Sequence, residues 1–363
     1  MFTVGHAVFA TAMGAGTYAP ATVEFDGRLT VAKRIAVLGD GAMGIACALV
    51  LASKPDVQVT VWSPVDEYGR LVQQKRESVR YLPGVPIPET IQLTLDLAEA
   101  TEGAELLLAA IPTVYLRWTL ERHKEVLRGN LAAVVSVIKG LEEGTLLRPT
   151  QIIAEILGDL PLVVLAGPSH AEEISRGLPA SVVAASLDAY WAETVQRLFM
   201  TDRFRVYTNP DPIGVELCGA LKNVIAIAAG ISDGLQLGDN AKSALLTRAL
   251  VEMMRFVEAH GGRAATVYGL AGVGDLITTC ISVHGRNLRV GREIGRGKKL
   301  PDVLTELQLT AEGVWTARAV YERARQLQLD MPICTEVYRV LYEEKPPLAA
   351  VRDLMMREAG SEY

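Results

Sequence analysis

The chain has 363 residues, of which 50% are hydrophobic and 21% are charged, and its formal net charge is −6 at pH 7. This composition is typical of a compact globular protein with large cores, leaves room for two domains, and excludes an intrinsically disordered chain. The acidic balance argues against a general nucleic-acid-binding protein, although residues 286–299 are locally basic and suit a small anionic ligand.

The first 30 residues are expected to form a loose extension before the first strand. Residues 7–15 are mildly apolar, but no lysine or arginine precedes them, which argues against a signal peptide. Further along the chain, Asp, Glu, Lys or Gly interrupts each apolar run before it reaches the roughly 18 to 20 residues that a spanning helix needs. The sequence therefore predicts no integral membrane segment.

A glycine-rich loop, Gly39-Asp-Gly-Ala-Met-Gly44, directly follows a predicted strand over 34–39 and opens a predicted helix over 45–53. The first glycine permits a tight turn, the second lets the backbone approach a pyrophosphate, and the third allows close packing of helix on strand. The loop predicts binding of NAD or NADP; the alternative is an ordinary glycine-rich turn. The cofactor-binding residues expected in it are Gly39, Gly41, Ala42, Met43 and Gly44.

The second strand, predicted over 57–62, leads into Ser63-Pro-Val-Asp66. An NAD-selective site usually has an acidic residue at the end of this strand, whereas an arginine there accommodates the 2′-phosphate of NADP. Here the acid comes late and no arginine is adjacent, so we expect weak discrimination or a modest preference for NADPH, with Ser63 on the adenosine side. The alternative is that Asp66 turns back to the ribose and selects NAD.

Further strands alternate with helices, which predicts an α/β fold with a parallel sheet covered on both faces. The strands are predicted over 105–111, 132–138, 162–166, 181–185 and 204–207, and helices over 114–127 and 149–157. Three strand ends are unusual: Ile111-Pro-Thr-Val, Val137-Ile-Lys-Gly140 and Ala166-Gly-Pro-Ser-His-Ala171. Alone, Lys139 reads as a solvated edge charge and Gly-Pro-Ser as turn chemistry. Together, at the sheet edge where ligands bind in such folds, they predict a shared site.

Strand patterns cease after Asn209-Pro-Asp-Pro212, and helices are predicted over 213–232, 241–260 and 288–295. We therefore expect a Rossmann-like NAD(P)-binding domain over 31–209 and an all-helical substrate and catalytic domain over 210–363. The four cysteines, at positions 47, 218, 280 and 334, share no short spacing, so neither a metal site nor a disulfide framework is predicted. A reducing cytoplasm fits best.

Lys222 and Asn223 stand in a helix of small and apolar residues, 215–230, with hardly another charge. Burial disfavours the ammonium form and draws the pKa of a lysine toward the working pH, where it can both give and take a proton. The alternative is a core lysine that extends its ammonium to water.

Asp275 lies in a glycine-rich turn, 272–280, where it reads either as a helix N-cap or as a partner that orients Lys222. Arg286 and Asn287 supply hydrogen-bond donors suited to a phosphate, or form part of a solvated basic loop.

The chain resembles the NAD(P)-dependent glycerol-3-phosphate dehydrogenase family from about Arg34 to its end. The motifs that carry this resemblance are the glycine-rich loop, Arg80-Tyr-Leu-Pro-Gly84, Ile-Lys-Gly, Gly-Pro-Ser, Glu-Leu-Cys-Gly-Ala-Leu-Lys-Asn, Gly-Asp-Asn-x-Lys, Gly-Asp-Leu-Ile-Thr-Thr-Cys, Gly-Arg-Asn and Ala311-Glu-Gly-Val314. Two departures are Met43, where an aromatic residue is common, and Trp62-Ser-Pro in place of a Trp-x-Arg-type signal. The second departure leaves the coenzyme preference open.

The resemblance implies a role for each matching residue. Lys222 would be the proton donor and acceptor, with Asp275 and Lys139 as its catalytic neighbours. Substrate contacts would come from Lys139, Gly167, Ser169, Lys222, Asn223, Asp275, Arg286 and Asn287. Cofactor contacts beyond the loop and Ser63 would come from Lys139, Ala171, Arg286 and Glu312.

The implied activity is reduction of dihydroxyacetone phosphate to sn-glycerol 3-phosphate by NAD(P)H, in the direction that supplies phospholipid synthesis. The expected partner is a small phosphorylated substrate; the oligomeric state stays open, with a homodimer as one alternative. A related β-hydroxyacid dehydrogenase would carry glycine four residues before the lysine and asparagine four after it, where this chain has Cys218 and Ala226. A catalytically idle dinucleotide sensor would be expected to lose Lys222 and Asp275.

Overall fold

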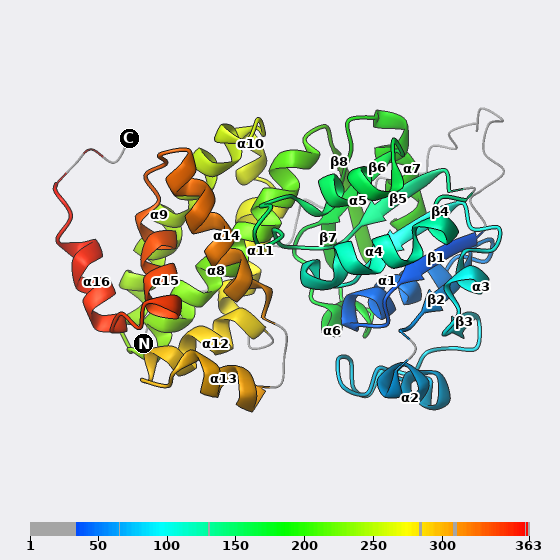
Figure 1. The fold of residues 1–363 in the computed structure, drawn as a ribbon, viewed down its shortest axis with the longest axis horizontal. Coiled ribbons are helices and arrows are strands. Elements are labelled where there is room, and N and C mark those ends of the chain that lie inside the picture. The colour runs from blue at the N-terminus through cyan, green and yellow to red at the C-terminus, as the bar shows by residue number, and fades with distance from the viewer. Residues whose placement is uncertain are drawn as a thin grey trace, which may run out of the picture. The chain divides into compact units, whose positions relative to one another are not determined.

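The computed structural model describes residues 34–64, 66–129, 131–282, 285–307, 311–359 and 361. The extension expected over residues 1–30 lies outside them. The described part contains one eight-stranded sheet, followed along the chain by a set of helices (Figure 1).

The sheet has the strand order β3-β2-β1-β4-β5-β6-β7-β8. Its strands are β1 (Arg34–Leu38), β2 (Gln58–Trp62), β3 (Ile91–Thr94), β4 (Leu106–Ala109), β5 (Ala133–Ser136), β6 (Leu162–Ala166), β7 (Ala180–Ala185) and β8 (Phe204–Asn209). The α/β class predicted from the sequence is confirmed. The edge strand β3 was not predicted, because it is only four residues long and includes an exposed glutamine.

The alternation of strands and helices suggested a wholly parallel sheet, but one pair of neighbouring strands is antiparallel. The pairs from β3 through β6 are parallel, but β7 runs antiparallel to β6, and β8 runs parallel to β7. A parallel return needs a long crossover, usually with a helix that spans the sheet. Residues 167–179 contain only the four-residue helix α6 (Ala171–Ile174), which is too short to carry the chain back.

Helices cover both faces of the sheet, because successive side chains of β1 point to opposite faces and are buried on both. Ile35 and Val37 belong to one core cluster, shared with α1 and α7, while Ala36 and Leu38 belong to another, shared with α4 and α5. The helices of this part, besides α6, are α1 (Ala42–Ala52), α2 (Glu67–Lys75), α3 (Leu97–Thr101), α4 (Thr113–Leu127), α5 (Pro149–Leu157) and α7 (Ala189–Phe199). Because β1, β4, β5 and β6 run parallel to one another, their carboxyl ends meet at one edge of the sheet.

Every regular element described after β8 is a helix. These are α8 (Pro212–Gly234), α9 (Gly238–Ala259), α10 (Ala264–Val267), the π-helix η1 (Leu270–Gly274), α11 (Asp275–Ile281), α12 (Arg286–Gly295), α13 (Leu300–Leu307), α14 (Glu312–Gln326), α15 (Pro332–Tyr342) and α16 (Pro347–Met355). In α8 each residue from Gly214 to Ser232 is buried, so the other helices pack around it. A helix that is apolar on all sides belongs inside a core.

Among the described residues, two segments are long and apolar enough to cross a membrane by length and composition alone, although the sequence analysis expected every apolar run to be interrupted sooner. One is α8, and 94% of its most apolar window is buried inside the protein, as in the core helix of a globular domain. The other, Ala264–Ile281, is 44% buried and comprises α10, η1 and α11.

The close contact between α8 and α12 positions the start of α12. A Cβ added to Gly291 would lie 2.1 Å from the carbonyl oxygen of Ile227, and one added to Gly230 would lie 2.2 Å from that of Leu288. Only glycine permits backbones to approach this closely. Gly295 likewise meets the carbonyl of Ile231, so the two helices run in the same direction and Arg286 and Asn287 begin beside the middle of α8.

Candidate active site

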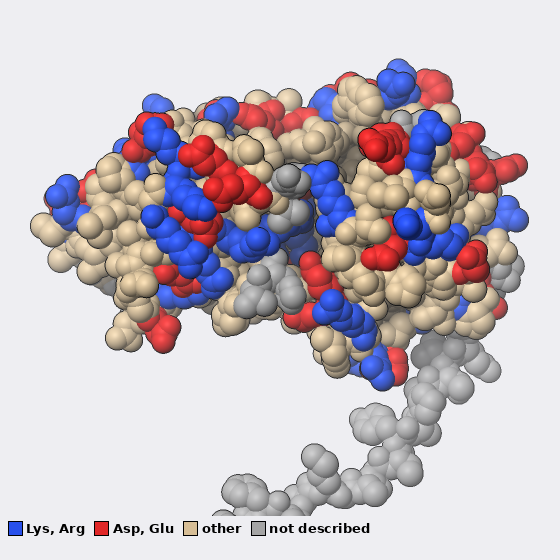
Figure 2. Space-filling model, turned by 90° about the horizontal axis from the view of Figure 1, so that it is seen from below, with Lys and Arg blue, Asp and Glu red and all other residues tan. Residues whose placement is uncertain are grey.

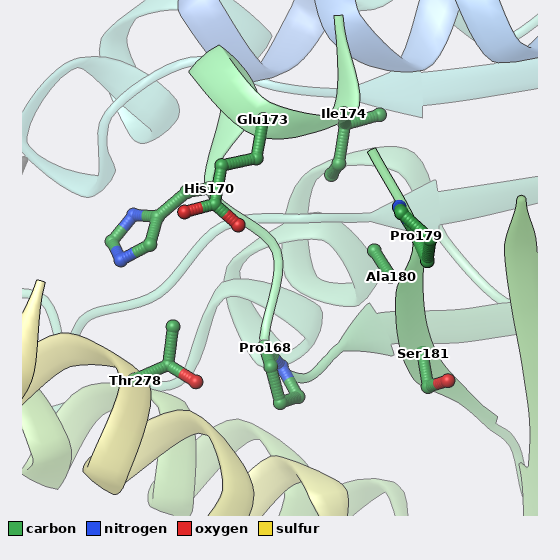
Figure 3. A pocket seen from close by; sticks show the side chains of 8 residues that line it. All are labelled: Pro168, His170, Glu173, Ile174, Pro179, Ala180, Ser181 and Thr278. Carbon is green, nitrogen blue, oxygen red and sulfur yellow. The ribbon is translucent and has the colours of Figure 1, made fainter. Parts of the chain in front are cut away.

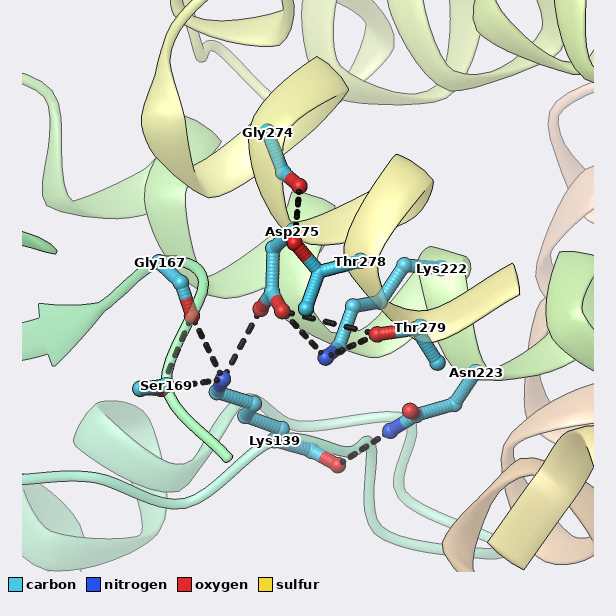
Figure 4. A network of polar contacts seen from close by, with 9 residues as sticks. All are labelled: Lys139, Gly167, Ser169, Lys222, Asn223, Gly274, Asp275, Thr278 and Thr279. Atoms are coloured by element: carbon cyan, nitrogen blue, oxygen red, sulfur yellow. Dashed lines mark hydrogen bonds and ion pairs between the residues drawn. The ribbon is translucent and has the colours of Figure 1, made fainter. Parts of the chain in front are cut away.

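Asp275 is the centre of the polar cluster drawn in Figure 4. Its Oδ1 accepts a hydrogen bond from Nζ of Lys222 at 2.6 Å, and its Oδ2 accepts one from Nζ of Lys139 at 2.8 Å (Figure 4). Lys139 follows β5, Lys222 lies on α8, and Asp275 begins α11. The sheet edge and the helical core thus each supply one lysine to a single carboxylate.

This geometry decides between the alternatives left open by the sequence. The Asp275 side chain caps no helix: Gly274 stands at the N-cap position, and both carboxylate oxygens bind lysines. The Lys222 side chain is 7% exposed, so it does not extend to water, and the Lys139 side chain is 15% exposed and ion-paired.

Burial and charge together set the proton affinities of the cluster. The pKa of Lys222 is lowered to about 8. Burial is the largest cause; the charge of Asp275 opposes the lowering, and the nearby ammonium of Lys139 adds to it. Burial raises the pKa of Asp275, but the two ammonium groups outweigh it, and the pKa ends below its usual value. Lys222 can therefore exchange its proton close to neutral pH, beside a carboxylate that stays ionised.

The remaining contacts fix both lysines in place. Nζ of Lys222 lies 2.7 Å from Oγ1 of Thr279, and Nζ of Lys139 lies 3.2 Å from both the carbonyl oxygen of Gly167 and Oγ of Ser169. The Asn223 side chain donates to the backbone carbonyl of Lys139 at 3.2 Å. Thr279 was not predicted as a site residue. Its spacing, four residues after Asp275, was the available signal, because such residues share a helix face.

Behind the Gly-Pro-Ser turn lies a cavity of about 230 Å³, drawn in Figure 3. Its lining comes from Pro168, His170, Glu173, Ile174, Pro179, Ala180, Ser181 and Thr278. The pKa of His170 is lowered by burial and by the charge of Lys222. Pro168 and Thr278 each adjoin a residue that contacts a lysine of the cluster, so the cavity borders the cluster.

A second polar group joins α12 and α14 to the end of β4. The backbone N–H of Gly313 donates to Asn287 at 3.0 Å, and the N–H of Thr113 donates to the Glu312 carboxylate at 3.1 Å. Arg286 is exposed at the start of α12. Burial raises the pKa of Glu312 above its usual value, and the charge of Arg286 partly opposes this rise. Lysine and arginine side chains gather near the middle of the face drawn in Figure 2, as an anionic ligand requires.

The glycine-rich loop has the shape that a dinucleotide needs. Gly39 has a φ of +117°, and a Cβ at Gly44 would lie 2.1 Å from the carbonyl oxygen of Gly39, so both positions are closed to larger residues. Gly41 has nothing within 4 Å of an added Cβ, and no side chain caps α1. The N–H groups at Ala42 and Met43 therefore remain available to a pyrophosphate.

The residues predicted for the adenosine side, Ser63 and as an alternative Asp66, differ in burial and in hydrogen bonding. Ser63 is 2% exposed, and the Asp66 carboxylate accepts a hydrogen bond from the N–H of Gly69 at 2.7 Å as the N-cap of α2. Asp66 would have to give up this cap to bind a ribose. Ala171 is buried at the start of α6, next to the turn that holds Lys139.

Glu216 fastens α8 to the sheet side of the cluster, a role that the sequence analysis did not predict. Its carboxylate accepts hydrogen bonds from the N–H of Thr150 at 2.9 Å and from the Thr150 hydroxyl at 2.5 Å, and it pairs with Arg148. Glu216 is 2% exposed and precedes Lys222 by six residues on the same helix.

Comparisons with known proteins agree along most of the chain. Residues 34–192 match the family described as NAD-dependent glycerol-3-phosphate dehydrogenase N-terminus, and residues 211–352 match its C-terminus. A relative from Chlorobium chlorochromatii (strain CaD3), named glycerol-3-phosphate dehydrogenase (NAD(P)+), is 46% identical over 332 residues, which cover 90% of this chain and 99% of the relative. A protein of the same name from Desulfitobacterium hafniense (strain Y51) is 47% identical over 324 residues, covering 89% and 91%.

A solved structure has the same fold. The crystal structure of glycerol-3-phosphate dehydrogenase from Coxiella burnetii is 38% identical and superposes with a TM-score of 0.86, covering 90% of this chain and 99% of that one. Glycerol-3-phosphate dehydrogenase from Saccharomyces cerevisiae, at 28% identity, superposes with a TM-score of 0.75, covering 90% and 99%.

Replacing Glu216 by glutamine is expected to lower the free energy of unfolding by about 3 to 5 kcal/mol, because it leaves the largely buried Arg148 without a counter-charge. The double variant Arg148→Met with Glu216→Gln removes both charges and should regain most of that loss. Urea unfolding measures both. Glu344→Gln, which breaks an exposed pair with Lys299, serves as the control. Equal losses in the single and double variants would show that the ion pair is not the cause.

Proposed function

The chain belongs to the NAD-dependent glycerol-3-phosphate dehydrogenase family, and we propose that it interconverts dihydroxyacetone phosphate and sn-glycerol 3-phosphate at the cluster around Asp275. It is an oxidoreductase that uses NAD or NADP. The observation that supports this site most strongly is the buried Lys222, whose pKa of about 8 and contact with Asp275 suit it to proton transfer beside a dinucleotide-binding loop.

Lys222 carries the proton in this proposal. A reduced nicotinamide, when bound, would supply the hydride to the carbonyl carbon of the substrate. As charge develops on the carbonyl oxygen, an N–H bond of the Lys222 ammonium breaks and an O–H bond forms, leaving a neutral amine. Asp275 holds that nitrogen in place, and a solvent proton restores the ammonium; in the oxidation direction the neutral amine accepts the proton.

Lys139 binds and orients the substrate in this reaction. Its ammonium lies among Asp275, Gly167 and Ser169, where it can also donate to the carbonyl oxygen. Asn223 fixes the backbone of Lys139 and lies beside Lys222. Arg286, with Asn287 and the N-terminus of α12, would hold the phosphate through charge-assisted hydrogen bonds.

The loop fits the pyrophosphate of the cofactor, and we assign the remaining contacts as follows. Gly39, Gly41, Ala42, Met43 and Gly44 would face the pyrophosphate, Ser63 the adenosine, and Lys139, Ala171, Arg286 and Glu312 the nicotinamide side. Because no arginine follows β2 and no carboxylate ends it, we propose weak discrimination with a modest preference for NADPH.

We place the enzyme in the cytoplasm, where its product would supply glycerophospholipid synthesis, with a small phosphorylated substrate as partner and no nucleic acid. A catalytically idle dinucleotide sensor would be expected to lose Lys222 and Asp275. Both residues are present, and Nζ of Lys222 lies 2.6 Å from Oδ1 of Asp275, which disfavours this alternative. The domain boundary near residue 209 stays a prediction.

The test of this function is a steady-state assay of the purified protein with dihydroxyacetone phosphate and NADH or NADPH, on wild type and Lys222→Ala. Loss of the proton donor should lower kcat by about 10² to 10⁴, while cofactor binding changes little. Lys345→Ala is the control, because this lysine is also ion-paired, to Glu336 and Asp353, but lies between α15 and α16, away from the cluster (Figure 1). Wild-type turnover in Lys222→Ala would refute the assignment.

The pH dependence of reduction should follow Lys222, which must be protonated to donate. We expect kcat to fall as pH rises through about 8. Asp275 raises the pKa of Lys222, so Asp275→Asn should lower it and move the fall to lower pH by about one unit or more. Asp233→Asn, at a carboxylate paired with Lys242 and Arg292, should leave the profile unchanged. A profile that Asp275→Asn moves to higher pH would contradict this role.

Arg286→Ala should raise the KM for dihydroxyacetone phosphate about tenfold or more, because a charge-assisted contact with the phosphate is worth about 1.5 to 3 kcal/mol. Unphosphorylated dihydroxyacetone, a poorer substrate, should be affected less. Arg289→Ala, at an exposed position on the same helix, is the control. An equal loss for both compounds would mean that Arg286 acts on the cofactor or the fold.

A further inference from the structure

Asp40, between the first two glycines of the loop, is a buried carboxylic acid with an unmet hydrogen-bonding oxygen. The residue is 6% exposed, and its Oδ2 has no hydrogen-bond partner among the described residues. A buried acceptor without a partner costs about 1 to 3 kcal/mol, so folded proteins keep few of them. Within a dinucleotide-binding loop, a donor on the bound ligand is the natural partner for such an oxygen.

The surroundings of Asp40 place it on the adenosine side of the loop. The N–H of Gly39 donates to the carbonyl of Trp62, the last residue of β2, at 3.1 Å. The Ser78 hydroxyl donates to the backbone carbonyl of Asp40 at 2.9 Å. Burial raises the pKa of Asp40, and a hydrogen bond with the Ser63 side chain lowers it, so its carboxyl lies next to the residue that follows β2. In Rossmann folds the end of β2 is where the adenosine ribose is recognised.

The first acid after β2 along the chain already makes a hydrogen bond. Asp66 is exposed, and its carboxylate caps α2 through Gly69. No acidic residue ends β2, where NAD-selective sites usually have one, and Asp40 of the loop can supply this carboxylate instead.

We propose that Asp40 reads the 2′ position of the adenosine ribose: its carboxylate accepts a hydrogen bond from the 2′-hydroxyl of NAD and repels the 2′-phosphate of NADP. This inference rests on the proposed function, because it assumes that the loop binds these dinucleotides. It also accounts for weak discrimination, since the small Ser63 admits a 2′-phosphate while the charge of Asp40 opposes it. Asp40 thus limits the preference for NADPH.

The experiment compares Asp40→Asn with Asp66→Asn in the full chain, by measuring the Kd of NADH and of NADPH without substrate. Each variant removes one negative charge near the end of β2, and asparagine at position 66 can still cap α2. Asp40→Asn should shift the ratio of the two Kd values about tenfold toward NADPH, because it removes the like-charge repulsion between the Asp40 carboxylate and the 2′-phosphate. Asp66→Asn should leave the ratio unchanged. The opposite pattern would overturn the proposal in favour of Asp66.

Asp40→Ala guards against a folding defect in the first variant. It deletes the unmet oxygen, so the melting temperature of the cofactor-free protein should not fall, whereas the stabilisation that NADH adds should shrink. An unchanged Kd ratio in this variant also overturns the proposal. Because these measurements use binding alone, a wild type that binds NADH without reducing dihydroxyacetone phosphate would count against the proposed function and leave the role of Asp40 to be decided separately.

Discussion

One buried carboxylate makes the site possible. Asp275 is 2% exposed, and it neutralises the charge of two lysines that come from different parts of the chain. Without it, two ammonium groups would face each other in a region poor in water, which costs several kcal/mol per uncompensated ion. The triad keeps one net positive charge, so the cluster suits an anionic substrate and repels a further cation.

The same principle fixes the rotation of α8 within its core. The close glycine contacts with α12 already restrict how α8 can turn. The buried charges restrict it further, because Glu216 must meet Thr150 and Arg148 while Lys222 meets Asp275. Breaking either pair leaves a buried charge alone, so these contacts hold the helix in the one register that assembles the cluster.

Local patterns predicted much of this molecule, and contacts between distant segments account for the rest. The glycine-rich loop, the α8 helix and the strand ends at Lys139 and Ser169 were visible as short motifs. The reversal at β7 was not, because it depends on how far residues 167–179 can reach rather than on their periodicity. The sharing of Asp275 by two lysines, and the place of Asp40 beside Ser63, arise only when the sheet edge and the core helices meet. The roles of these residues in catalysis and binding stay predictions.

Sharing one carboxylate between two lysines also tunes the proton donor. If Asp275 served Lys222 alone, its full charge would raise the pKa of that lysine, and proton release would become costly. Burial is the largest cause of the lowering of the pKa of Lys222 to about 8, and the positive charge of Lys139, which takes one of the two oxygens, acts in the same direction. A donor whose pKa lies near the pH of its surroundings both gives and regains a proton readily. In the proposed reaction, Lys139 would therefore contribute to proton transfer without moving a proton itself, and this contribution depends on the sheet edge and the helical core meeting at Asp275.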